Sequence, residues 1–126
     1  MSKNIIHEKS FYFAINIVRK CRDLVDVQKE YVISRQLLSG GTSVGAMIRE
    51  SKFAESRSDF IHKLSITQKE IQETIYWLDL LEAVDILNKD EHKSLSEDAI
   101  EIRKIITAII ITTKHNSLSK SPRRNS

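Results

Sequence analysis

The chain has 126 residues and a formal net charge of +3, and 40% of its residues are hydrophobic. This is the length of one domain, and three glycines and one proline provide too few turns for a β-sandwich or barrel. The single cysteine excludes an internal disulfide and a cysteine-rich zinc site. No apolar run has the length of a signal sequence or a membrane span, so we expect a soluble, cytoplasmic protein without membrane contact.

The positive charge is concentrated at the C-terminal end of the chain. Four of the 20 basic residues and none of the 17 acidic residues lie within residues 114–126, so the remainder carries a net charge of −1. Residues 114–126 are polar, contain the only proline and lack apolar periodicity, which predicts a disordered basic tail after a folded domain of residues 1–113. Such a tail is usually a solubilising terminus, although it can also attract nucleic-acid phosphates.

Apolar residues at helical spacing predict a first helix over roughly residues 8–27. The stripe steps by three or four residues through Phe11, Ala14, Val18, Cys21 and Val25. The residues that lie off this stripe and are expected to face solvent are Arg19, Lys20, Arg22 and Asp23. Because Cys21 lies on the stripe, a buried structural thiol is favoured over a nucleophile.

All three glycines of the chain, Gly40, Gly41 and Gly45, fall within a second apolar pattern between residues 29 and 52. A glycine cluster usually marks a loop, yet helical spacing continues through Ile33, Leu37, Gly41, Val44 and Ile48. We therefore predict one continuous helix whose small residues let a neighbouring helix approach closely. Two glycines inside a helix cost about 2 kcal/mol relative to alanine, which such packing can offset. A phosphate-binding loop is disfavoured, because no lysine follows at P-loop spacing and no strand precedes.

Two further helices are predicted in the remainder of the domain. Residues 58–85 place a core face at Phe60, Leu64, Ile71, Ile75, Leu78 and Leu81. Ser56 and Asp59 form a capping box at the start of this helix. A charged loop over residues 87–93 follows, and a second capping box at Ser94 and Glu97 predicts where the last helix begins.

The last helix is apolar on two sides. One stripe runs through Leu95, Ala99, Ile102, Ile106 and Ile109, and other isoleucines add apolar surface on a second side. Four amphipathic helices with short connections predict an all-α, antiparallel, up-and-down four-helix bundle. Because a small monomer rarely exposes a large apolar patch, we expect an oligomer interface at Ile105, Ile110 and Ile111.

The sequence contains no arrangement of residues that is typical of catalysis or of a metal or cofactor site. A di-iron bundle needs two Glu-x-x-His motifs, whereas this chain has only one related pair, Asp59 and His62. Glu70 and Glu73 stand three residues apart, and a solvated helix face is favoured over a general acid–base pair. Aromatic residues do not alternate with basic ones as in a single-strand binding platform. We therefore expect no cofactor, no metal and no enzymatic activity.

Residues 36–81 carry an ordered combination of motifs. The segments QLLSGGTSVGAMIRES and DFIHKLSITQKEIQETIYWLDLL contain Gly-Thr-Ser-x-Gly-Ala and then Glu-x-x-Glu-Thr-x-Tyr-Trp-Leu. In this combination the chain resembles the four-helix-bundle proteins encoded by 23S rRNA intervening sequences, also labelled S23 ribosomal proteins. It departs from the family pattern at Met47, where many relatives carry Asn, and at the second glycine, Gly40. The motif residues, which we interpret as mainly structural, are Gln36, Ser39, Thr42, Ser43, Gly45, Glu50, Phe60, Glu70, Glu73, Tyr76 and Trp77.

The resemblance implies a ring-like homopentamer and a non-enzymatic binding module that is associated with RNA or a ribonucleoprotein. A related branch, the accessory subunits of diversity-generating retroelements, implies an alternative: a protein scaffold that docks a polymerase-like or reverse-transcriptase-like partner. If RNA binds, the candidate phosphate contacts are Arg19, Lys20, Arg22, Arg49, Lys52, Arg57, Lys120, Arg123 and Arg124. The net charge of −1 outside the tail opposes strong non-specific binding, whereas five tails in a pentamer would strengthen it.

Overall fold

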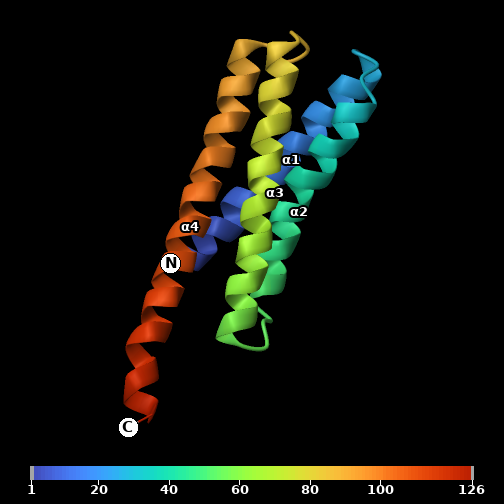
Figure 1. Ribbon diagram of the computed structural model, residues 1–126. Coiled ribbons are helices and arrows are strands. Elements are labelled where there is room, and N and C mark those ends of the chain that lie inside the picture. Colours follow the sequence, from blue (N-terminus) through green and yellow to red (C-terminus); the bar gives the residue numbers. More distant parts are fainter. Residues whose placement is uncertain (1, 126) are drawn as a thin grey trace.

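Four helices and no strand make up residues 2–125, which are the residues described by the structure, a computed structural model; side chains are described for residues 5–116. The helices are α1 (Ser2–Asp26), α2 (Val32–Ser51), α3 (Arg57–Ala83) and α4 (Lys89–Asn125). Successive helices run in opposite directions (Figure 1). Each helix packs against the next, and α4 returns to pack against α1. The predicted all-α class and the four helices are confirmed.

The buried side of α1 is not the stripe expected from the sequence. Its buried hydrophobic residues are Ile6, Phe13, Ile17, Cys21 and Leu24. Phe11, where the expected stripe begins, is instead 51% exposed. Residues 11–18 are almost entirely apolar, so two stripes fit helical spacing, and the contacts of α1 with α2 and α4 select between them. Cys21 is buried as predicted, and its Sγ donates a hydrogen bond to the carbonyl oxygen of Ser34 at 3.4 Å.

α2 continues through the glycines without a break, as the apolar spacing predicts. A Cβ atom at Gly41 would lie 2.8 Å from Cγ1 of Ile17 in α1. A Cβ atom at Gly40 would lie 2.5 Å from Oγ1 of Thr74 in α3. Both distances are shorter than real side chains allow, so the missing Cβ atoms are what lets α2 approach its two neighbours. The predicted close helix approach is confirmed.

The α1–α2 and α3–α4 connections lie at the same end of the bundle, at the top of Figure 1. Lys29 and Asp85 adopt φ angles of 58° and 63°, in the left-handed region that usually holds glycine after a helix. In both connections, backbone N–H groups bond back to carbonyl oxygens of the last helical turn. Gln28 Nε2 donates to the carbonyl oxygen of Ile86 at 2.9 Å. The two connections are therefore tied to each other.

Of the two predicted capping boxes, one corresponds to a helix start in the structure and the other does not. At α3 the prediction is confirmed: Ser56 is the N-cap, and its side chain accepts a hydrogen bond from the backbone N–H of Asp59 at 3.0 Å. At α4 the predicted start at Ser94 is wrong, because the helix begins before it. Asn88 Oδ1 accepts from the N–H of Glu91 at 2.8 Å, and Glu91 Oε1 accepts from the N–H of Asn88 at 3.2 Å. This reciprocal pair caps α4 inside the segment expected to be a charged loop.

The isoleucine-rich part of α4 turns most of its apolar side chains toward the bundle. Ile110 is only 7% exposed, so it belongs to the core and not to the outer face where we expected an oligomer interface. Ile105 is half-buried, and Ile111 is 62% exposed. α4 packs against both α1 and α3, so the bundle covers more than one of its sides.

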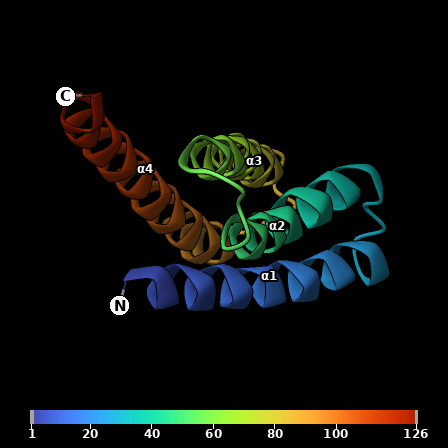
Figure 2. The ribbon, with the colours of Figure 1, turned by 90° about the horizontal axis from the view of Figure 1, so that it is seen from below.

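α4 also extends past residue 113, where the sequence suggests that the domain ends. Its bounds run to Asn125, so residues 114–125 form part of a helix, whereas the sequence predicts a disordered tail. Figure 2 shows α4 leaning away from the other three helices toward its C-terminal end. Ser126 and the side chains of residues 117–125 lie outside the described part of the chain. The division into residues 1–113 and 114–126 stays a prediction.

Candidate functional site

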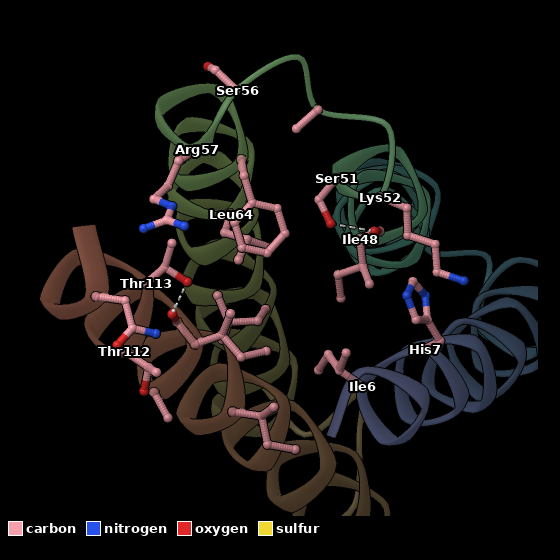
Figure 3. A pocket seen from close by; sticks show the side chains of 17 residues that line it. Ile6, His7, Ile48, Ser51, Lys52, Ser56, Arg57, Leu64, Thr112 and Thr113 are labelled. Carbon is pink, nitrogen blue, oxygen red and sulfur yellow. Dashed lines mark hydrogen bonds between the residues drawn. The ribbon is translucent and has the colours of Figure 1, made fainter. Parts of the chain in front are cut away.

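A cavity of about 790 Å³ lies at the end of the bundle where α4 leans away from α3. All four helices line it, with apolar side chains that include Ile6, Ile48, Phe60, Leu64, Ile106 and Ile109. In Figure 3, Ile6, Ile48 and Leu64 approach the cavity from three different helices. None of the described residues that line it is acidic. We call this end of the molecule the open end; it comprises the start of α1, the end of α2, the start of α3 and residues 105–116 of α4.

Basic groups surround the cavity of the open end. Lys52 and Arg57 are exposed and contribute to its wall, at the end of α2 and the start of α3. His7 lies beside Lys52, and Arg57 lies across the cavity from both (Figure 3). Partial burial and the positive charges of Lys52 and Arg49 lower the pKa of His7. Since Lys52 and Arg49 contribute to the lowered pKa of His7, their positive charges act at the position of His7 in the open end.

Two of the predicted phosphate contacts, Lys52 and Arg57, contribute to this cavity wall, and a third, Arg49, lies one helical turn before Lys52. Arg49 lies in the last turn of α2, Lys52 is the residue that follows this helix, and Arg57 opens α3 after a short connection. Among the described residues, none of these three forms an ion pair. Arg49 instead lies over the ring of Phe11, with Cζ 5.4 Å from the ring centroid. Their charges are therefore available to an anion.

The other predicted basic residues do not join this group. Arg19 and Arg22 are exposed on α1, about 18 Å or more along the helix from His7. Lys20 was expected to face solvent, but it is half-buried and pairs with Glu91 of α4. Its charge is compensated inside the bundle, so its assignment as a phosphate contact is corrected. The side chains of Lys120, Arg123 and Arg124 lie outside those described.

The motif residues do not converge on the cavity. Phe60 is the one motif residue that contributes to its wall. Thr42 and Ser43 donate their hydroxyl hydrogens to carbonyl oxygens one turn earlier in α2, at 2.7 and 2.5 Å. Tyr76 and Trp77 contact each other edge to face, with ring centroids 5.1 Å apart. The remaining motif residues occupy exposed or half-buried positions of α2 and α3: Gln36, Ser39, Gly45, Glu50, Glu70 and Glu73.

Two exposed aromatic side chains were not predicted as exposed: Phe11 was expected in the core stripe of α1, and Phe53 was not singled out. Phe53, two residues beyond the end of α2, is 82% exposed, and Phe11 lies on the neighbouring helix under Arg49. Phe11 and Arg49 are distant in the sequence and meet only because α1 and α2 are antiparallel neighbours. The one local signal was Phe53 itself, an apolar residue outside every helical stripe.

The described side chains offer little for metal or covalent chemistry. No three of their His, Cys, Asp and Glu side chains lie close enough together to hold a metal ion. Burial raises the pKa of the Cys21 thiol, which disfavours the reactive thiolate.

None of the described helices is both long and apolar enough to cross a membrane.

Comparison with known proteins agrees with the four-helix architecture. The family model of the 23S rRNA-intervening sequence protein matches residues 2–108. No match is found among curated proteins. The crystal structure of a protein with unknown function from the S23 ribosomal protein family of Bacteroides thetaiotaomicron VPI-5482 matches with a TM-score of 0.86 and 45% sequence identity, covering 87% of this chain and 98% of that one. The chain therefore belongs to the 23S rRNA-intervening sequence protein family.

Proposed function

We propose that this protein is a non-enzymatic, oligomeric binding module that associates with RNA or a ribonucleoprotein through the open end of its bundle. The observation that carries the proposal is the presence of Lys52 and Arg57 in the wall of a cavity whose described lining contains no carboxylate, with Arg49 one helical turn before Lys52. Membership in a family named for 23S rRNA intervening sequences supports a connection with RNA.

The phosphate backbone of RNA suits this end on electrostatic grounds. Each arginine or lysine that neutralises a phosphate releases condensed counterions, which makes binding favourable and strongly dependent on salt. The chain outside residues 114–126 has a net charge of −1, so its surface as a whole does not attract a polyanion. Binding therefore depends on the local concentration of positive charge at the open end.

We further propose that the module is a homopentamer, as the family resemblance implies. Five copies of the open end would multiply a weak affinity through avidity. Of the three isoleucines expected at the interface, Ile111 keeps a largely exposed side chain. Light scattering is expected to give about five times the chain mass of 14.5 kDa. A monomer at micromolar concentration would contradict this part of the proposal.

Charge reversal at the open end tests RNA binding. The double variant Lys52→Glu/Arg57→Glu is expected to weaken binding of total RNA by about tenfold or more at low salt, and to flatten the dependence of log Kd on log salt concentration. The matched control is Arg19→Glu/Arg22→Glu, which reverses two exposed charges of α1 away from the open end and is expected to bind almost normally. Unchanged affinity in the first variant, or equal loss in both, would refute the assignment.

A second candidate function is a scaffold that docks a polymerase-like or reverse-transcriptase-like protein without touching nucleic acid. The apolar lining of the cavity favours this function, because apolar side chains can bury a protein segment but do not bind phosphate. This function predicts that a polymerase co-purifies with the protein after nuclease digestion and is lost in Ala108→Arg, which blocks the cavity. Ala83→Arg, an exposed alanine at the end of α3, is the control. Loss of the polymerase on nuclease digestion would contradict the scaffold.

A further inference from the structure

We infer that Phe11, Arg49 and Phe53 form a surface on which unpaired RNA bases stack. We call this surface the aromatic face. The inference rests on the proposed function and deepens it, because it names the class of RNA that the open end recognises: single strands and unpaired loops in preference to continuous duplex.

The aromatic face combines two exposed rings with a guanidinium group. The Phe11 ring is half-exposed, and Arg49 Cζ lies 5.4 Å from its centroid. Phe53 lies four residues after Arg49, in the turn that follows α2, and its ring is largely exposed. The backbone N–H of Phe53 donates to the carbonyl oxygen of Glu50 at 2.9 Å, which fixes the backbone of Phe53 against the end of α2. The ring is thus held at its base and free on its faces.

Unpaired bases suit these three groups better than a duplex does. A nucleobase can stack on a phenylalanine ring or on a guanidinium plane whatever its sequence. Lys52 and Arg57 lie at the same end and can take the phosphates of the same strand. In a duplex the bases are already stacked on one another, so only the phosphates would contribute. The aromatic face therefore adds affinity for single strands only.

The neighbouring Tyr12 marks where this surface ends. It is also exposed, but it lies in a hollow between α1 and α4 whose charged lining residues are Glu8, Asp98, Glu101 and Lys9, which pairs with Glu101 at 2.9 Å. Partial burial and the negative charge of Glu101 raise the pKa of Asp98. Three acidic side chains against one basic side chain make this hollow less favourable to phosphate than the open end.

Substitutions of Phe53 test stacking, with a labelled oligouridine and a fully paired duplex of the same length as probes. Phe53→Ala is expected to weaken oligouridine binding by about 5- to 150-fold, the range for loss of one stacked base, and to leave duplex binding unchanged. Phe53→Leu should be as weak as Phe53→Ala, because leucine is apolar without a flat face, whereas Phe53→Trp should retain binding. Tyr31→Ala removes a ring as exposed as that of Phe11 at the opposite end of the bundle, and should have no effect.

The outcomes separate stacking from the proposed function. If Phe53→Ala binds oligouridine normally while Lys52→Glu/Arg57→Glu does not, stacking is refuted and phosphate binding stands. The same conclusion follows if the unmodified protein binds duplex as tightly as oligouridine, or if Phe53→Leu retains full affinity. If the unmodified protein binds neither probe at low salt, both the inference and the proposed function fail.

Discussion

α2 and α4 are held in the bundle in opposite ways. α2 lies between α1 and α3 and approaches both through Gly40 and Gly41, where Cβ atoms would overlap with neighbouring side chains. α4 contacts α1 and α3 along its first turns and then leans away (Figure 2), which leaves the cavity. The start of α4 is fixed by the cap between Asn88 and Glu91 and by the ion pair of Glu91 with Lys20.

This difference shows where a small helical bundle can form a binding site. Helices whose backbones approach closely leave no space between them, so the α1–α2–α3 side is a continuous core. Branched side chains keep α4 apart from its neighbours, and α4 continues past their ends. The inner surfaces of the helices are exposed there. The cavity, with Lys52 and Arg57 in its wall, lies where α4 separates from the others, whereas Phe11 and Arg49 of the aromatic face meet on the outer surface of α1 and α2.

The largest expected effect comes from filling the gap between α1 and α2. Gly41→Leu should reduce the free energy of unfolding by about 3 kcal/mol, because the new side chain must displace Ile17, which is branched and fully buried. Gly45→Ala is the control, because its Cβ would lie at an ordinary 3.5 Å from the Ser10 carbonyl oxygen. Replacing this helical glycine should raise the free energy of unfolding by about 0.5–1 kcal/mol. Denaturant unfolding measures both. Equal stability of the two variants would show that α2 is not closely packed.

An intermediate effect is expected where α4 is anchored. Asn88→Ala removes the side chain that accepts a hydrogen bond from the N–H of Glu91, and should lower the free energy of unfolding by about 1 kcal/mol. Ser94→Ala changes an exposed residue within the helix, and its free energy of unfolding should stay within about 0.5 kcal/mol of that of the parent. Thermal unfolding of the two variants compares the observed helix start with the one suggested by the sequence. The reverse order of stability would place the start at Ser94.

The smallest effect is a dependence of stability on pH through Glu91. The Lys20 ammonium group and the Asn88 N–H lower the pKa of Glu91 below its ordinary 4.5. The folded state therefore binds this proton less readily than the unfolded state, so the contribution is fully present above pH 4.5 and is lost as the pH falls through the lowered pKa. Glu91→Gln should make stability fall less steeply in acid, as measured by unfolding between neutral pH and pH 3. A slope identical to that of the parent would contradict the role of this ion pair.

The fold could be predicted from the sequence wherever only one apolar stripe fitted a helix. In α2 a single stripe passes through Gly41, and the predicted helix was confirmed. In α1 the choice between Phe11 and Phe13 depends on where α2 and α4 lie, which the local sequence does not contain. The start of α4 was misplaced because two capping patterns stand close together, and Asn88 was hidden among charged residues.

The candidate site could be predicted only as separate parts. Arg49, Lys52 and Arg57 were named for their charge, but the position of Lys52 and Arg57 at the cavity depends on how the α2–α3 connection folds, and the position of Arg49 over Phe11 depends on the arrival of α1 beside α2. Lys20 was wrongly included, because its partner Glu91 is brought near only by the packing of α4 on α1. The contact of Arg49 with Phe11 joins two helices, so neither sequence segment alone predicts it.

The positive φ angles of Lys29 and Asp85 bear on how far the melting temperature of this protein can be raised. All three glycines of the chain lie in α2, and none stands at these two turns, where an L-residue in the left-handed region costs about 1–2 kcal/mol. Glycine at either position would relieve that strain at the end of the bundle opposite the cavity. Thermal robustness and ligand recognition can therefore be engineered separately, one at each end of the molecule.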